Sequence, residues 1–294
     1  MSRLVAWWPP WLVLAISYSL AFPLTWLPWG RLRAAHGNLS LVWPAMSFSQ
    51  RQKLLWHCVA GWLATGIELY QVGVKAGNPQ RLLRQIQTEG LDHLDKALRQ
   101  GHGVILLSAH MGNFPWFVLH LAMRGYPVTV LYKEQSALPV HFFRNIMNRF
   151  GVEGLAVKEG RSQATRWALR ALRHGRILFI HMDQGRRQGE TVRFLGQMVQ
   201  LPAGPAVLAA ASGAPCLPAM TWRTGRRHIA HILPPLELAP ERSPQAMKAN
   251  MQIMASALEQ AILDHPAQWL WMHRLFKWGK PCGSSKETSL RGIS

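Results

Sequence analysis

Short, almost uninterrupted apolar runs recur along the chain and alternate with segments whose apolar residues have helical spacing. The runs are GVILLSA at 103–109, PVTVLY at 127–132, RILFIHMD at 176–183, PCLPAMTW at 215–222 and HIAHILPPL at 228–236. Helical patterns lie at 47–70, 91–100, 117–124, 140–150, 161–174, 203–212 and 242–265. Buried strands have this continuous apolar character, and their alternation with helices predicts an α/β sheet. Neither an internal repeat nor a second domain is indicated.

The chain starts with a long uncharged segment. No charged residue occurs from Leu4 to Trp29, and five of the 14 tryptophans fall there. This length could cross a bilayer, which needs roughly 20 helical residues, although prolines interrupt it. Tryptophan also favours the membrane–water interface. We expect a membrane anchor over 1–33; the alternatives are a cleaved signal peptide and a hydrophobic hairpin lying in the interface.

The charge balance is strongly basic, with 33 Lys and Arg against 14 Asp and Glu and a formal net charge of +19. Such a balance indicates an anionic partner, and the Trp-rich start favours lipid. Nucleic acid is not expected as a partner, because the basic residues are scattered and no recognition motif is visible. Cys58, Cys216 and Cys282 are far apart, so they suggest neither a zinc site nor a disulfide framework but a reduced, cytosolic setting. No histidine spacing indicates a metal site.

A histidine follows the first apolar run, in the stretch SAHMGNFPW at 108–116. In open α/β sheets, functional residues gather at the carboxyl ends of strands. Proline prefers the first helical position, so we expect a helix to start near Phe114 or Pro115. A neutral His110 could take a proton from a hydroxyl that attacks a carbonyl, and nearby backbone N–H groups could stabilise the oxyanion. The alternative is a structural histidine bonded to a turn carbonyl.

Several ordered blocks extend this motif over most of the chain. They are AHMGNF at 109–114, HGNLSLVWPAMS at 36–47, FGVEGLAVKEG at 150–160, MDQGRRQGETVRFLGQMVQLPAGPAVLAAASGAPCLPAMTWR at 182–223 and HPAQWLWMHRLFKW at 265–278. Together, from about Gly30 to Lys277, the chain resembles the late lipid A acyltransferase family. These lauroyl and myristoyl transferases of Gram-negative bacteria belong to the wider glycerolipid acyltransferase superfamily.

The resemblance implies a single α/β domain at 34–280, with a central mixed sheet flanked by helices. The Gly- and Ser-rich, charged composition of the tail at 281–294 predicts that it is disordered. It also implies transfer of a fatty acyl group from acyl carrier protein or coenzyme A to a hydroxyl of lipid A or a related glycolipid. The expected location is the cytoplasmic face of the inner membrane. No cofactor is expected beyond the acyl thioester as co-substrate. A basic surface would attract both an acidic carrier protein and lipid phosphates.

One position departs from the family pattern. The family motif is a histidine, four residues and then Asp or Glu, and counted from His110 the position of the acid is Pro115. Loss of the acid that orients a histidine can cost about 10⁴ in rate, as in serine proteases. Three explanations are open: another acid orients His110, with Asp183 the first candidate and Glu134 the second; a backbone carbonyl or Asn113 holds the ring; or the chain binds lipid or acyl carrier without catalysis.

The remaining candidates are expected around the corner, the turn between the apolar run at 103–109 and the helix that starts near Phe114. His110 and Asp183 are the predicted catalytic residues, although Asp183 could instead cap a turn at Gly185. Arg186 and Arg193 could contact a phosphate or the carrier protein, or form a solvated basic loop. The residues expected to bind substrate are Gly112, Asn113, Gln184, Arg186, Arg193 and Glu134.

Overall fold

The computed structural model of the chain describes residues 3–74, 84–133, 138–157 and 161–278. The helices are η1 Arg3–Trp7, α1 Pro10–Leu24, α2 Gly30–Val42, α3 Phe48–Val74, α5 Leu91–Leu98, α6 Phe114–Met123, α7 Leu138–Arg149, α8 Arg161–Arg173, α9 Gly204–Ser212, α10 Pro244–Asp264, η2 Pro266–Gln268 and η3 Leu275–Trp278. The strands are β1 Ile86–Glu89, β2 Val104–Ser108, β3 Val128–Lys133, β4 Glu153–Val157, β5 Ile177–His181, β6 Glu190–Phe194, β7 Gln197–Leu201, β8 Cys216–Thr224 and β9 Arg227–Ile232.

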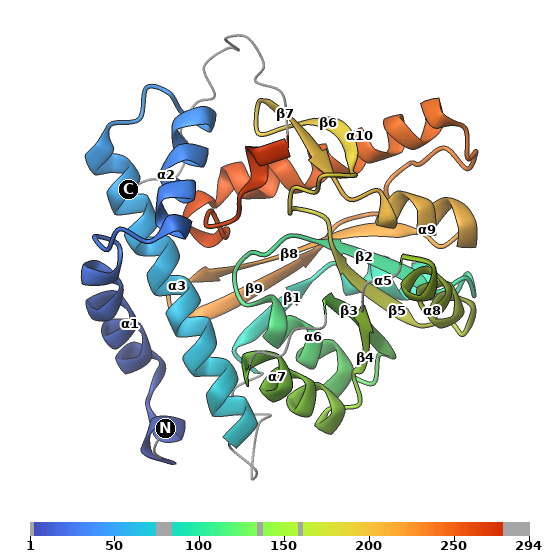
Figure 1. Ribbon diagram of the computed structural model, residues 1–294. Coiled ribbons are helices and arrows are strands. Elements are labelled where there is room, and N and C mark those ends of the chain that lie inside the picture. Colours follow the sequence, from blue (N-terminus) through green and yellow to red (C-terminus); the bar gives the residue numbers. More distant parts are fainter. Residues whose placement is uncertain (1–2, 75–83, 134–137, 158–160, 279–294) are drawn as a thin grey trace.

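Seven strands form the central sheet, in the order β1-β9-β8-β2-β5-β3-β4 (Figure 1). All neighbouring strands are parallel except β8 and β9, which are antiparallel. The chain therefore has the predicted single α/β domain with a mixed central sheet flanked by helices. Strands β6 and β7 form a separate antiparallel hairpin. Since β2 and β5 are parallel neighbours, their carboxyl ends meet at the same edge of the sheet.

The sheet separates two apolar cores, because successive side chains of a strand point to opposite faces. On β2, Ile105 and Leu107 pack with α8, α9, α10 and the segment that follows α10. Val104 and Leu106 pack on the other face, with α5, α6 and α7. Helix α3 contributes to both cores: its early residues belong to the first and Val72 to the second. Figure 1 shows α3 crossing beside the sheet and its helical layers.

The uncharged N-terminal segment is divided into η1 and the 15-residue helix α1, which starts at Pro10. Helix α1 packs on α3, with Val13, Ser17 and Ala21 buried. The Trp56 indole on α3 donates to the carbonyl of Tyr18 at 2.8 Å. Among the helices in the described ranges, none has the length and apolar character needed to cross a bilayer.

All five predicted apolar runs form strands, namely β2, β3, β5, β8 and β9. Four further strands were not predicted. β1, β6 and β7 carry several polar residues because they lie at an edge of the sheet or in the hairpin, and β4 is the other edge strand. The predicted disordered tail at 281–294 lies outside the described residues.

Candidate active site

His110 lies at the carboxyl end of the central strand. β2 ends at Ser108, and α6 begins at Phe114, in agreement with the expected helix start. Asn113 caps α6, since its Oδ1 accepts the backbone N–H of Trp116 at 3.2 Å. The His110 side chain is 23% exposed, so it is held by the protein but reachable from outside.

Asp183 lies directly beside this histidine. β2 and β5 are aligned with Ser108 opposite His181, and continuing the register by two residues places His110 beside Asp183. Nδ1 of His110 is 2.8 Å from Oδ1 of Asp183, and the backbone N–H of His110 donates to Oδ2 at 2.7 Å. The indole N–H of Trp269 also donates to Oδ2, at 2.7 Å. The carboxylate is therefore held by three donors.

The environment of Asp183 favours its ionised form. The carboxyl is fully buried, and burial by itself raises its pKa. Attraction to His110 and the hydrogen bonds from it outweigh burial and hold the pKa well below its usual range. Because a carboxylate can only accept, the proton of neutral His110 is on Nδ1. The lone pair of Nε2 then faces away from Asp183, as a general base requires.

Two further histidines surround His110. The ring of His181 stacks on it with centroids 4.1 Å apart, and the ring of His273 lies 5.3 Å away at a steep angle. Burial, and then the nearby His110, lower the pKa of His181 well below its usual value. Burial also lowers the pKa of His273 to about 4. The imidazole rings of His181 and His273 are therefore neutral near pH 7.

The side-chain amide of Gln184 joins two of these imidazoles. Its Nε2 lies 3.1 Å from Nε2 of His110 and 3.0 Å from Nε2 of His273. The same nitrogen is also 3.4 Å from Nδ1 of His110, so it lies over the face of that ring, and it can donate to Nε2 of His273. Gln184 is exposed, whereas the adjacent Asp183 is buried. The structure thus brings the predicted residues His110, Asp183 and Gln184 together.

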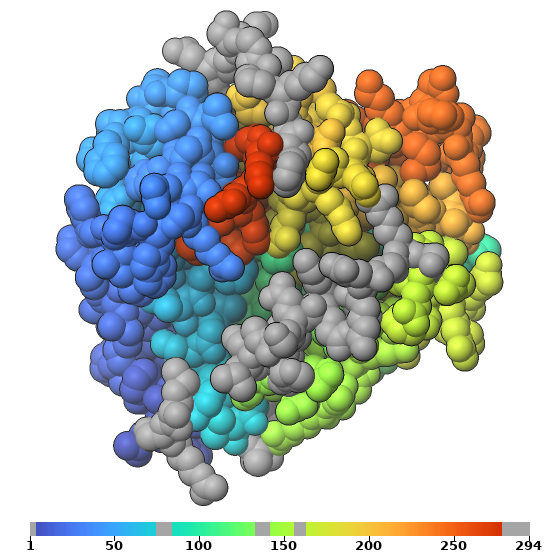
Figure 2. Space-filling model, in the orientation of Figure 1, coloured from blue at the N-terminus to red at the C-terminus, as the bar shows by residue number. Residues whose placement is uncertain are grey.

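Sequence reasoning missed the two neighbouring histidines. His181 is the last residue of β5 and precedes Asp183 by two residues in the apolar run RILFIHMD, so the twofold repeat of a strand was a signal that both point to the same side. His273 had no such local signal, because it reaches the site from the segment that follows α10. Figure 2 shows this red segment between the blue N-terminal helices and the yellow hairpin. Asn38 of α2 fixes it by donating to the carbonyls of Trp271 and His273, at 2.8 and 2.6 Å.

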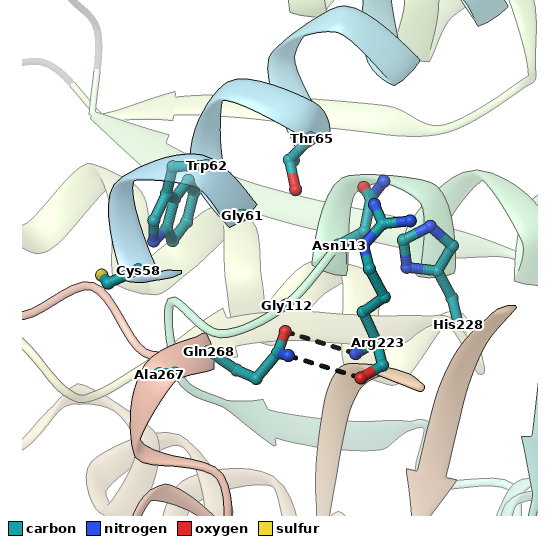
Figure 3. Close-up of a pocket in the computed structure, with 10 residues that line it drawn as sticks. All are labelled: Cys58, Gly61, Trp62, Thr65, Gly112, Asn113, Arg223, His228, Ala267 and Gln268. Atoms are coloured by element: carbon teal, nitrogen blue, oxygen red, sulfur yellow. Dashed lines mark hydrogen bonds between the residues drawn. The ribbon is translucent and has the colours of Figure 1, made fainter. Parts of the chain in front are cut away.

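A buried ion pair between Glu68 and Arg223 holds Asn113, the residue that caps α6. Asn113 is 1% exposed, and its Nδ2 donates to Oε2 of Glu68 on α3 at 2.8 Å. Arg223 of β8 donates to both oxygens of Glu68, at 2.7 and 2.6 Å. Burial raises the pKa of Glu68, but the contacts with His228 and Arg223 outweigh it and leave the pKa lowered. Figure 3 shows Arg223 extending from its strand towards Asn113.

Gly112 is required at the corner by its backbone and by its neighbours. Its φ is +54°, and a Cβ there would lie 2.2 Å from the carbonyl oxygen of Thr221. Its N–H donates to the carbonyl of Gln268 at 2.9 Å. The cavity that Gly112 and Asn113 help to line has a volume of about 10 Å³, enough for roughly one water and far too small for an acyl chain (Figure 3). The placement of Gly112 and Asn113 thus indicates that they hold the corner, and their predicted contact with substrate stays untested.

Pro115 and three charged residues complete the set that the sequence singled out. Pro115, which replaces the acid of the family motif, is buried in the first turn of α6. Arg186 and Arg193 are exposed, before and within the first strand of the β6–β7 hairpin. Glu134, the second candidate for the missing acid, lies outside the described residues. The predicted roles of these three charged residues stay predictions.

Comparison with known proteins agrees with this geometry. The sequence profile of the bacterial lipid A biosynthesis acyltransferase family matches residues 1–278. The chain belongs to this family. The lipid A biosynthesis lauroyltransferase of Escherichia coli K12 is 24% identical over 261 residues, 84% of this chain and 79% of that protein. The palmitoleoyltransferase of the same strain is 27% identical over 259 residues, 85% of this chain and 80% of that protein.

A second group of relatives acts on a different glycolipid. The phosphatidylinositol mannoside acyltransferase of Mycobacterium tuberculosis H37Rv is 29% identical over 218 residues, 73% of this chain and 67% of that protein. The relatives have acyl transfer to a lipid in common, and this chain is an acyltransferase of that kind. In this acyltransferase, the carboxylate of Asp183, two residues after the end of β5, contacts the His110 imidazole, while Pro115 stands at the position of the motif acid. The site thus combines a partly exposed imidazole with a buried, ionised carboxylate.

Proposed function

We propose that the protein transfers a fatty acyl group from a thioester, carried by acyl carrier protein or coenzyme A, to a hydroxyl of lipid A or a related glycolipid. The contact between His110 and Asp183 carries the proposal. Nε2 of His110 accepts the hydroxyl proton while the oxygen attacks the thioester carbonyl carbon. Asp183 keeps the other nitrogen protonated and stabilises the imidazolium that forms. The carbon–sulfur bond then breaks, and the departing thiolate takes the proton from His110.

The pair also speaks against a chain that only binds lipid or acyl carrier. A buried carboxylate is costly unless it is paired, and here three donors are aligned on Asp183, two of them from His110. The third donor, Trp269, comes from a different part of the chain. This arrangement suits a histidine that becomes charged during the reaction.

Thioester consumption tests the activity. Purified protein is incubated with lauroyl-coenzyme A or lauroyl acyl carrier protein, with and without a lipid A precursor, and thiol release is followed. We expect His110→Ala to lower the rate by about 10²–10⁴, the usual contribution of a general base. His102→Ala is the matched control, because His102 is exposed at the opposite end of β2. Equal, measurable rates for wild type and His110→Ala would make His110 structural, whereas no thiol release from wild type would support the binding-only alternative.

The acceptor is identified by comparing lipids of a deletion strain with those of the parent strain. The names of the relatives support two acceptor classes, lipid A and a phosphatidylinositol mannoside. Mass spectrometry of the extracted lipids gives the acyl length and the acceptor from the species that disappears. Loss of an acyl chain from a lipid without sugar would contradict the glycolipid acceptor.

The N-terminal segment supports a membrane-associated enzyme at the cytoplasmic face of the inner membrane. Trp7, Trp11, Trp26 and Trp29 are each more than half exposed. Trp7 and Trp11 lie around the start of α1, and Trp26 and Trp29 follow its end. Exposed tryptophan suits the lipid interface. Trp26 lines an apolar hollow of about 290 Å³, together with Phe22, Thr25, Phe48, Ser49, Gln52, Lys53 and Trp56. The segment would dock on the bilayer as an anchor without a spanning helix, and the positive charge of the chain would favour anionic headgroups.

Vesicle co-sedimentation tests this docking. We expect Trp26→Ser with Trp29→Ser to weaken binding to phosphatidylglycerol-containing vesicles by at least about tenfold, since burial of one such side chain is worth more than about 1.4 kcal/mol. Trp167→Ser on α8 is the matched control, because that tryptophan is also exposed. Equal loss in both variants, or none in either, would reject the N-terminal face as the docking surface.

A further inference from the structure

The apolar hollow beside Trp26 lies between the end of α1 and the first turns of α3. Four aromatic rings surround it in edge-to-face contact. The ring centroid of Phe22 is 6.5 Å from that of Trp26 and 5.8 Å from that of Trp56, and Trp26 is 6.4 Å from Phe48. Phe22, Trp26 and Phe48 are each more than half exposed, so the hollow opens to the surface. Figure 1 shows α1 on the outer side of α3, away from the sheet.

The two buried polar side chains that line the hollow are already bonded inside the protein. Thr25 donates its hydroxyl to the carbonyl of Phe22 at 2.8 Å. Nε2 of Gln52 donates to the carbonyl of Thr25 at 3.0 Å, and its Oε1 lies 3.0 Å from Nε2 of His36. The hollow therefore suits a hydrocarbon chain better than a polar ligand. Its 290 Å³ is about twice the volume of a cavity that binds benzene, so it holds roughly ten carbon atoms.

The chain around the hollow is cationic. Lys53 is exposed and lines the hollow itself. No Asp or Glu occurs in the sequence before Glu68. The basic residues of the same stretch are Arg3, Arg31, Arg33, Arg51 and Lys53. Such a surface attracts anionic headgroups, whereas a second copy of this chain, with its net charge of +19, would be repelled.

The hollow is separate from the catalytic cluster around His110. None of the residues that line it belongs to that cluster. Trp56 and Met272, the neighbour of His273, pack against one small core, which is made of Ala21, Leu32, Val59 and Ala60. These side chains fill the space between the hollow and the catalytic histidines. A chain bound in the hollow is therefore not the acyl group that reacts.

We propose that this hollow binds one acyl chain of an anionic phospholipid of the bilayer, with Lys53 at the lipid phosphate. The proposal rests on the proposed docking of the N-terminal segment and gives that docking a defined lipid site. The acyl chain covers the exposed rings of Phe22, Trp26 and Phe48 and removes their apolar area from water. The amino group of Lys53 selects an anionic headgroup.

Native mass spectrometry of the full chain in a neutral detergent counts the bound lipids. The probes are dilauroyl phosphatidylglycerol and dilauroyl phosphatidylcholine, which have the same acyl chains and differ in headgroup charge. We expect the protein to retain one phosphatidylglycerol. Ser49→Phe places a ring in the hollow and should lower the affinity for this lipid at least about tenfold, the factor for about two methylene groups left unburied. Ser256→Phe on α10 is the matched control, because Ser256 is also exposed.

Lys53→Glu tests the headgroup. It should lower the preference for phosphatidylglycerol over phosphatidylcholine about fivefold or more, the factor for one basic residue beside an anionic lipid. Lys248→Glu is the matched control, because Lys248 is exposed on α10. Melting temperatures near that of wild type show that the variants fold.

An undiminished one-lipid complex in Ser49→Phe, or an unchanged headgroup preference in Lys53→Glu, would overturn the lipid site. Slower thiol release from lauroyl-coenzyme A in Ser49→Phe, but not in Ser256→Phe, would assign the hollow to the reacting acyl chain and overturn it as well. In each case, vesicle binding that still depends on Trp26 and Trp29 preserves the proposed docking. Vesicle binding that no variant changes would reject both.

Discussion

Replacing Asp183 by Asn tests the contact on which the mechanism depends. Oδ2 of Asp183 accepts two N–H groups, from the His110 backbone and the Trp269 indole, and Oδ1 faces Nδ1 of His110. The carbonyl oxygen of an asparagine must take the place of Oδ2, because an NH₂ there would face two donors. The NH₂ then faces Nδ1 and donates to it. This forces the His110 proton onto Nε2, so the imidazole can no longer accept the hydroxyl proton.

The size of the effect follows from this tautomer change. The corresponding substitution in serine proteases, which also leaves the histidine in the wrong tautomer, lowers kcat about 10⁴-fold. A factor of 10⁴ corresponds to about 5 kcal/mol in the activation free energy. We expect a loss of this size in acyl transfer for Asp183→Asn, with little change in the KM for the thioester, since Asp183 is buried behind the ring and cannot contact substrate.

Thiol release from lauroyl-coenzyme A gives the rate, and ¹⁵N chemical shifts of labelled histidine give the tautomer. Asp264→Asn is the matched control, because Asp264 is exposed at the end of α10. An Asp183→Asn variant that folds, that shows a proton on Nε2 of His110, and that keeps more than about a tenth of the wild-type rate would refute the reasoning. In that case His110 would not act as the base.

Three further predictions follow from the supporting contacts. Gly112→Ala should lower the melting temperature much more than Gly101→Ala, since both glycines have positive φ, worth about 1–3 kcal/mol, but only Gly112 lies against a carbonyl; equal shifts would contradict the steric argument. Glu68→Ala should lower the free energy of unfolding in urea by about 3–5 kcal/mol, because it leaves Arg223 buried without its carboxylate; a loss below about 1 kcal/mol would show that the pair is not stabilising. Lowering the pH through the unfolded-state pKa of Asp, about 3.9, should destabilise wild type more steeply than Asp183→Asn, because the stability from the lowered pKa of Asp183 is complete above that pH and is lost as the pH falls towards the folded-state pKa; parallel pH curves of the unfolding free energy would exclude this contribution.

Local patterns in the sequence were enough to predict the strands and the helix that carry the candidate active site. GVILLSA and RILFIHMD are apolar throughout because β2 and β5 are buried on both faces, and both runs were recognised as strands. Asn113 and Pro115 mark the start of α6 by capping and by backbone preference, which act within a few residues. The motif around His110 and the ordered blocks along the chain also predicted the family that the sequence comparisons show.

The uncharged segment from Leu4 to Trp29 shows which structural features composition alone does not predict. Its length is compatible with a spanning helix, but Pro9 and Pro10 separate η1 from α1, and α1 ends at Leu24. The contact with α3 then buries Val13 and Ala21, while several tryptophans stay exposed. Composition shows that this segment is apolar. Which side chains face α3 and which face outward depends on a helix almost 40 residues further along the chain.

The chain by itself determined a family, an α/β class and a histidine at the end of a strand. Only the tertiary structure decided what this histidine contacts. β5 follows β2 in the sheet although β3 and β4 lie between them in sequence, and their register places Asp183 on His110. His273 and Trp269 come from the end of the described chain, and Glu68 comes from α3. Strand order and register depend on burying both faces of the whole sheet, so a pattern of a few residues cannot specify these long-range neighbours.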